Sequence, residues 1–73
     1  MIGGMNLAEH ATLKNHQIVT RYILENQMFA EIALGNVYGH SIYHDGVYIH
    51  TSPIVSKENN VILTQSGNYY TLE

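Results

Sequence analysis

An Asp-Gly pair between two runs of strand-favouring residues is the feature that most constrains how this chain can fold. Asp45-Gly46 has isoleucine, valine and tyrosine on both sides, and Asp-Gly readily adopts the two positive φ angles that a two-residue hairpin turn requires. Antiparallel partners count outward from the turn, so the pair predicts strands over 40–44 and 47–51. One face of this hairpin carries the aliphatic side chains of Ile42, Val47 and Ile49. The opposite face carries Ser41, Tyr43, Tyr48 and His50.

A second hairpin is predicted at the C-terminal end. Strand-favouring runs over 61–65 and 69–72 flank Ser66-Gly67-Asn68, and either two-residue loop within this triplet pairs the strands with the same facial grouping. One face then carries Val61, Leu63, Tyr70 and Leu72. The other carries Ile62, Thr64, Tyr69 and Thr71.

The middle of the chain adds two more strands. The run from Ile18 to Ile23 is rich in β-branched and aromatic residues, which predicts a strand over 17–24. Residues 28–34 are compatible with a helix that Gly35 would end, but we prefer a strand.

The N-terminal segment is predicted to contain a short helix. Asn6 followed three residues later by Glu9 is a capping pattern, and it favours a helix from about Leu7 to Lys14. A disordered segment over 6–16 is the alternative, because so short a helix depends on tertiary packing. Residues 1–5 are expected to be a flexible N-terminus, and residues 6–73 a single small domain.

These elements predict a mainly β fold, α+β at most: an antiparallel meander of four or five strands with a short N-terminal helix. A rolled, SH3-like sheet is one arrangement of it. A chain of 73 residues buries a modest core, and without cysteine it has no disulfide or thiolate zinc site to support it. Self-association is the simplest remaining support, so we expect a homo-oligomer.

Charge and hydropathy exclude several classes of partner. The formal net charge is −3, and the permanent cations are Lys14, Arg21 and Lys57, too few for general phosphate binding, so a nucleic-acid partner is not expected. No apolar run has the length of a membrane span, and the N-terminus lacks the pattern of a signal peptide. The expected location is the cytoplasm.

Five histidines suggest a metal site, but the predicted strands do not bring them together. His40 and His44 would lie about 13 Å apart along one strand, with His50 on the other face. We therefore expect no metal and no cofactor, with histidines converging from two subunits as the alternative.

Catalysis is not expected either. The chain has no cysteine nucleophile and no paired carboxylates, and Ser41 opposite His50 lacks an acidic residue to orient the imidazole. The glycines at 35 and 39 lack the lysine of a phosphate-binding loop, and we interpret them as a bulge or a close backbone approach.

The remaining feature is an excess of tyrosine. Six tyrosines accompany a single phenylalanine, and tyrosine is common at binding interfaces because a large rigid ring buries area while its hydroxyl tolerates water. The alternative is that these rings complete a small core or a dimer contact. The predicted partner-binding residues are Tyr43, Tyr48, His50, Ser41 and Tyr69.

Turn and strand motifs follow one another over about the last forty residues: Gly35-Asn36-Val37-Tyr38-Gly39-His40, Asp45-Gly46, Thr51-Ser52, Thr64-Gln65-Ser66-Gly67 and Tyr70-Thr71-Leu72. This pattern resembles short uncharacterised proteins of bacteria and their phages. The resemblance implies no activity, but it makes a phage or mobile-element origin an expectation. The function expected is a non-enzymatic protein-interaction module. The alternatives are an inhibitor that blocks a host defence or regulatory protein, and a binder of a small ligand or metal at a subunit interface.

Overall fold

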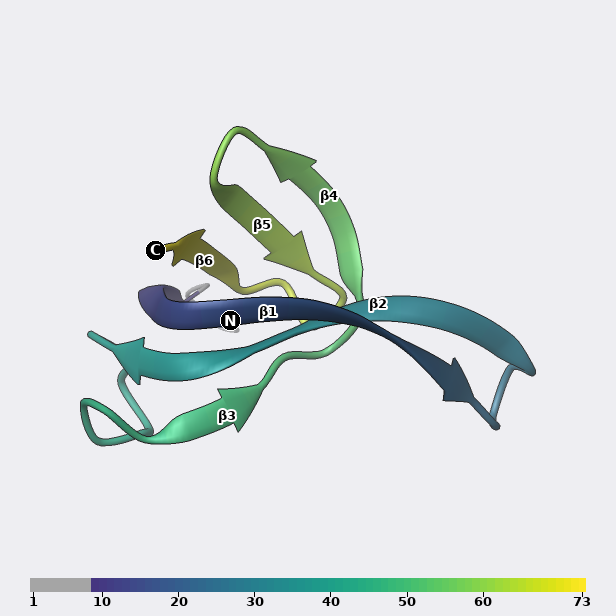
Figure 1. The fold of residues 1–73 in the computed structure, drawn as a ribbon, viewed down its shortest axis with the longest axis horizontal. Coiled ribbons are helices and arrows are strands. Elements are labelled where there is room, and N and C mark those ends of the chain that lie inside the picture. The colour runs from purple at the N-terminus through teal and green to yellow at the C-terminus, as the bar shows by residue number, and fades with distance from the viewer. Residues whose placement is uncertain (1–8) are drawn as a thin grey trace, which may run out of the picture.

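The computed structural model describes residues 9–73, which form one mixed sheet of six strands (Figure 1). The strands are β1 (His10–Ile23), β2 (Met28–Tyr38), β3 (Tyr48–His50), β4 (Ile54–Glu58), β5 (Val61–Thr64) and β6 (Tyr69–Leu72). Their order in the sheet is β3-β2-β1-β6-β5-β4. Neighbouring strands are antiparallel except β1 and β6, which are parallel. The mainly β class is confirmed, but the expected meander of four or five strands is wrong in strand number and connection.

The strands predicted over 17–24 and 28–34 are confirmed except at Leu24, which lies in the turn, because residues 17–23 belong to β1 and residues 28–34 to β2. These two strands form one long hairpin, interrupted by a bulge between Lys14 and Gln17 at which Asn15 has a φ of 54°. Beyond the bulge the hairpin extends past its neighbours, since β6 pairs only with the start of β1 and β3 only with the end of β2 (Figure 1). We call residues 19–32 the arm.

The helix expected from about Leu7 to Lys14 is wrong where the structure describes it, because residues 10–14 belong to β1. Leu7 and Ala8, like the segment 1–5, lie outside the described residues. The start of β1 pairs on both sides, with β6 from His10 to Leu13 and with β2 from Thr12 onward. The backbone hydrogen bonds of these two ladders outweigh the weak local preference of residues 10–14 for a helix. Among residues 9–73 no helix is long and apolar enough to cross a membrane.

The hairpin predicted around Asp45-Gly46 is wrong in its pairing. A turn does form there, with Gly46 at a φ of 92° and the Val47 amide donating to the His44 carbonyl over 3.2 Å. However, residues 39–47 form a loop, and β3 pairs with β2 instead, placing Gly35 opposite Ile49. Ile42, expected in the core, is 77% exposed.

The C-terminal hairpin forms with a different register from the predicted one. Its loop has three residues, 65–67, with Gly67 at a φ of 92°, so Ile62 faces Tyr70 and Leu63 faces Tyr69. A three-residue loop with its last residue in the left-handed region is a common hairpin connection. It shifts the pairing by one position relative to a two-residue loop, so Ile62 shares a face with Tyr70 and not with Tyr69.

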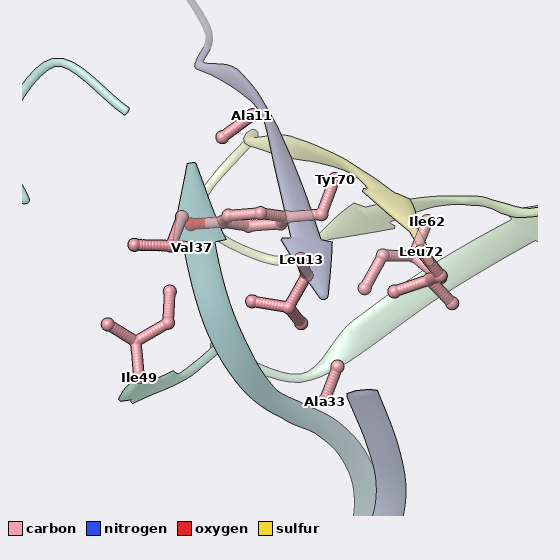
Figure 2. Packing of buried hydrophobic residues seen from close by; sticks show 8 residues of the cluster. All are labelled: Ala11, Leu13, Ala33, Val37, Ile49, Ile62, Tyr70 and Leu72. Carbon is pink, nitrogen blue, oxygen red and sulfur yellow. The ribbon is translucent and has the colours of Figure 1, made fainter. Parts of the chain in front are cut away.

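The core lies on one face of the sheet, which we call the inner face (Figure 2). Its buried cluster consists of Ala11, Leu13, Ala33, Val37, Ile49, Ile62, Tyr70 and Leu72. Every strand except β4 contributes to it, and Ile54 of β4 packs against it from the side. Because successive residues of a strand point to opposite faces, this arrangement leaves a second set of side chains directed away from the core.

Candidate functional site

The face opposite the core, which we call the outer face, is rich in aromatic and polar side chains. The registers place Asn36 opposite Tyr48, Thr12 opposite Tyr38, and Tyr69 beside both His10 and Leu63. The residues of this face are Tyr48 and His50 of β3, Leu34, Asn36 and Tyr38 of β2, His10, Thr12 and Lys14 of β1, Tyr69 and Thr71 of β6, and Val61 and Leu63 of β5.

Three tyrosines of the outer face are open to solvent. Tyr38 is 36% exposed, Tyr48 59% and Tyr69 40%. The Lys14 ammonium lies 4.9 Å from the centre of the Tyr38 ring, within the range of a cation–π contact. The His10 ring centre lies 5.9 Å from that of Tyr69. Each of these two rings therefore has a basic or imidazole neighbour from β1.

The structure brings three of the five predicted binding residues onto this face. Tyr48 and His50 both point outward from β3, and Tyr69 does so from β6, with β2 and β1 between them. Ser41 and Tyr43 instead belong to the loop 39–47. Tyr43 still borders a shallow hollow of about 280 Å³ that it shares with Tyr48 and His50.

His10 and Lys14 were missed as surface residues because a helix was expected there. The signal was present in the sequence: His10-Ala11-Thr12-Leu13-Lys14 alternates strictly between polar and apolar residues. Such alternation is typical of a strand with one buried face. The structure buries Ala11 and Leu13 and directs the other three side chains to the outer face.

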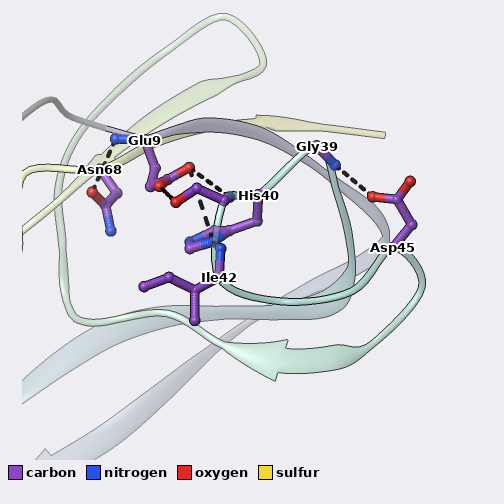
Figure 3. Close-up of polar contacts among 7 residues, drawn as sticks. Glu9, Gly39, His40, Ile42, Asp45 and Asn68 are labelled. Carbon is purple, nitrogen blue, oxygen red and sulfur yellow. Dashed lines mark hydrogen bonds and ion pairs between the residues drawn. The ribbon is translucent and has the colours of Figure 1, made fainter.

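Glu9, at the start of the described chain, lies between Asn68 and His40 in Figure 3 and also binds Ser41. The Glu9 carboxylate accepts hydrogen bonds from the Ser41 amide, over 3.1 Å, and from the Ser41 hydroxyl. The Glu9 amide donates to Asn68 Oδ1 over 3.2 Å. Glu9 therefore fixes the loop 39–47 and the β5–β6 turn to the start of β1, and we call this set of contacts the Glu9 latch.

His40 completes the Glu9 latch without forming a catalytic pair with Ser41. Its Nδ1 accepts a hydrogen bond from the Ile42 amide over 3.0 Å and lies 3.9 Å from Glu9 Oε1. Its side chain is 3% exposed, with its ring centre 4.7 Å from that of Tyr43 and 6.3 Å from that of Tyr70. The Ser41 hydroxyl donates to the Glu9 carboxylate and not to the His40 imidazole. Together these contacts hold the loop 39–47 in place.

The hydrogen bonds from the Ser41 hydroxyl and amide lower the pKa of Glu9, and the nearby His40 adds to this effect. A carboxyl whose pKa is lower in the folded state stabilises the fold above its unfolded pKa, and this stabilisation is lost as the pH falls through the folded pKa. We expect Glu9→Gln to lower the melting temperature at pH 7 and to have little effect below the folded pKa. Thermal melts of both proteins from pH 2 to pH 7 measure this. A difference that stays constant across the range would contradict the role of the carboxylate, and Glu58→Gln is the control.

The histidines are dispersed over the structure. Within the part of the chain that the structure describes, no three histidine, cysteine, aspartate or glutamate side chains gather closely enough to hold a metal ion. His10 uses Nε2 in a 3.2 Å contact with the Thr71 hydroxyl, and His16 uses Nδ1 in a 2.9 Å contact with the Glu73 carbonyl.

Neither the sequence nor the fold matches a known family model, a curated protein or a solved structure. The resemblance to short bacterial and phage proteins therefore stays a prediction.

Proposed function

We propose that this chain is a non-enzymatic module that binds a protein partner through its outer face. The observation that supports the proposal is the exposure of Tyr38, Tyr48 and Tyr69 on one side of a sheet whose other side already holds the core. Rings that are not needed for the core remain available for contact. Tyrosine is enriched at the centres of protein interfaces, where its ring is buried and its hydroxyl finds a polar partner.

The charge of the chain favours a protein over a nucleic acid on this face. Tyrosines on a sheet could stack bases, as in single-strand binding domains, but those domains combine stacking with a positive groove that follows the phosphates. The chain has only three lysine and arginine residues against six acidic ones. Among the described residues of β1, Lys14 and, farther along the strand in the arm, Arg21 are the permanent cations that the register with β2 places on this side of the sheet.

The finer expectations from the sequence fit within this proposal. An SH3-like roll would present such a face, and a phage-derived inhibitor of a host protein would use it to cover its target. A cytoplasmic location would suit either role.

Tyr48→Ala tests the proposal most directly, because Tyr48 is the most exposed tyrosine of the outer face and lies on the edge strand β3. We expect its loss to weaken partner binding by about 2 kcal/mol, roughly thirtyfold in Kd, as for a central interface tyrosine. The wild-type chain is immobilised and incubated with an extract of the cells that encode it. Proteins that bind are identified by mass spectrometry, and the affinity of each purified candidate is then titrated.

The matched control is Ile42→Ala, which truncates an exposed apolar side chain in the loop 39–47, off the outer face. A specific partner should be lost with Tyr48→Ala and kept with Ile42→Ala. Equal binding to both variants would reject the outer face as the contact surface. Circular dichroism of each variant verifies that the sheet remains folded.

A further inference from the structure

A hollow of about 410 Å³ lies on the outer face, over β4, β5, β6 and the start of β1, which are neighbours in Figure 1. We call it the β5 hollow, and its lining includes Val61 and Leu63 of β5, Glu58 of β4, Tyr69 of β6 and His10 of β1. Its volume falls within the roughly 300–1,000 Å³ of sites that hold small molecules. The hollow beside Tyr43 and Tyr48, at about 280 Å³, falls below this range.

The strand registers place the lining side chains on one side of the sheet. Leu63 pairs with Tyr69, and Tyr69 pairs with His10, so these three form a row across β5, β6 and β1. Glu58 pairs with Val61, two residues away along β5. Directly paired side chains point to the same face. The half-buried Val61 and Leu63 therefore form an aliphatic floor, with a carboxylate on one side and two rings on the other.

The two rings form a wall that side-chain contacts hold in place. The ring centres of His10 and Tyr69 lie 5.9 Å apart, with their planes inclined by 32°. His10 Nε2 lies 3.2 Å from the Thr71 hydroxyl, a contact that fixes the imidazole beside the tyrosine. Tyr69 is 40% exposed. Its ring is therefore free to pack against a ring of a ligand, or to attract a cation to its face.

The charge of the β5 hollow comes from Glu58. Among residues 9–73, Glu58 is the one carboxylate in the lining, and no lysine or arginine lines it. Glu58 forms no ion pair with any of these residues. Its neighbour Lys57 pairs with Ile62 on the inner face, and the Lys57 ammonium donates to the Asn59 carbonyl over 2.9 Å. The hollow therefore presents a negative charge that the described side chains do not neutralise, which favours a cation over an anion.

The spacing of these groups limits the size of the ligand. Two strand spacings and two residues along a strand separate the backbone of Glu58 from that of Tyr69 by about 12 Å. Both side chains reach into this space from opposite sides. A ligand that contacts both therefore needs a ring or a short hydrocarbon body beside Tyr69 and a cation on a short chain beside Glu58.

We propose that the β5 hollow binds a small organic amine, with its ammonium at Glu58 and its apolar body between the aliphatic floor and the Tyr69 ring. The ammonium donates to the carboxylate and is attracted to the tyrosine face. The apolar body covers Val61 and Leu63, which are only half-buried. This site goes beyond the proposed protein contact and does not require Tyr48, since β2 and β1 separate β3 from β6.

Phenethylamine and 3-phenylpropionate test the proposal as a matched pair, because both have a phenyl ring on a two-carbon chain and they carry opposite charges. Each is titrated into the nitrogen-15-labelled protein at pH 7.5 and followed by amide chemical shifts. Phenethylamine should bind with a Kd on the order of 1–10 mM, as a ligand of this size allows, and should shift the amides of β5 and Tyr69. The acid should bind at least about tenfold more weakly. Equal affinities, or shifts confined to other strands, overturn the proposal.

Nα-acetyl-lysine N-methylamide distinguishes a free amine from a lysine side chain of a protein. It carries the same ammonium on an aliphatic stem but has no ring to pack against Tyr69. We therefore expect it to bind more weakly than phenethylamine. Tighter binding of the lysine derivative would assign the hollow to a protein side chain and overturn the small-molecule assignment.

Variants of Glu58 and Tyr69 assign the two parts of the site. We expect Glu58→Gln to weaken phenethylamine binding about fivefold, and Tyr69→Ala to weaken it about tenfold. Glu31→Gln, the same substitution on β2 outside the hollow, is the control and should bind as the wild type does. Tyr48→Ala should also bind phenethylamine normally, so failure of the amine site and failure of the protein contact give different results. Circular dichroism verifies each fold, and an unchanged affinity in folded Glu58→Gln overturns the proposal.

Discussion

Leu13→Ala is expected to lower the free energy of unfolding by about 3 kcal/mol, the middle of the range for a buried leucine truncated to alanine. Leu13 is fully buried, and the registers place it opposite Val37 of β2 on one side and Leu72 of β6 on the other. Figure 2 shows it in the middle of the core cluster. Its removal leaves a cavity where three strands meet, and the surrounding backbone ladder cannot close it.

This loss is large relative to the total free energy of unfolding. A domain of this size has a free energy of unfolding of about 4–11 kcal/mol, so the variant should retain only about 1–8 kcal/mol. Urea denaturation at one fixed protein concentration measures the change. Ile42→Ala, at a side chain that is 77% exposed, should differ from wild type by less than about 0.5 kcal/mol. Similar losses for both variants would show that Leu13 is not at the centre of the core.

The sequence predicted strands well wherever residue type decides them locally. β-branched and aromatic residues over 17–24 and the run 28–34 were assigned to strands, and the structure places residues 17–23 in β1 and residues 28–34 in β2. The alternation of inward and outward side chains was also predicted correctly within β3, where Ile49 is buried while Tyr48 and His50 point to the outer face. Both results depend only on near neighbours in the chain.

Pairing between distant segments could not be predicted in the same way. Asp45-Gly46 indicates a turn, but it does not indicate which strand the following residues join. The free edge of β2 at residues 34–36 provides the partner for β3. Likewise the start of β1 becomes a strand because β6, about sixty residues later, pairs with it. A local capping pattern at Glu9 carries no information about that ladder.

The residues of the outer face were likewise predictable where residue type and alternation within one strand decide them, and not where distant strands must pair. Tyr48, His50 and Tyr69 were placed on a binding face from residue type and alternation, and the structure puts all three on the outer face. Ser41 and Tyr43 were assigned to it through a register that does not form. Side chains from β1 were missed because their place depends on the long-range pairing of β1 and β6.

Gly35→Ala is expected to cost about 3 kcal/mol, at the upper end of typical overpacking. Gly35 was interpreted from the sequence as a bulge or a close backbone approach, and the structure confirms a close approach. A Cβ there would lie 2.8 Å from Leu13 Cγ, 2.8 Å from the Lys14 carbonyl oxygen and 3.3 Å from His16 Cα. Two of these atoms belong to the backbone of β1 at its bulge, so the clash is relieved only by separating β1 from β2.

Gly39→Ala separates this steric cost from loss of conformational freedom. Gly39 has a φ of 80° and no atom within 4 Å of an added Cβ, so alanine there should cost about 1–2 kcal/mol through backbone strain alone. Urea denaturation compares the two variants, and amide exchange locates the effect. Gly35→Ala should speed exchange of the β1 and β2 amides around the bulge, whereas Gly39→Ala should affect only the loop that follows. If Gly35→Ala proved no more destabilising than Gly39→Ala, the close contact of β2 with the bulge of β1 would be wrong, and the position of the arm relative to the core with it.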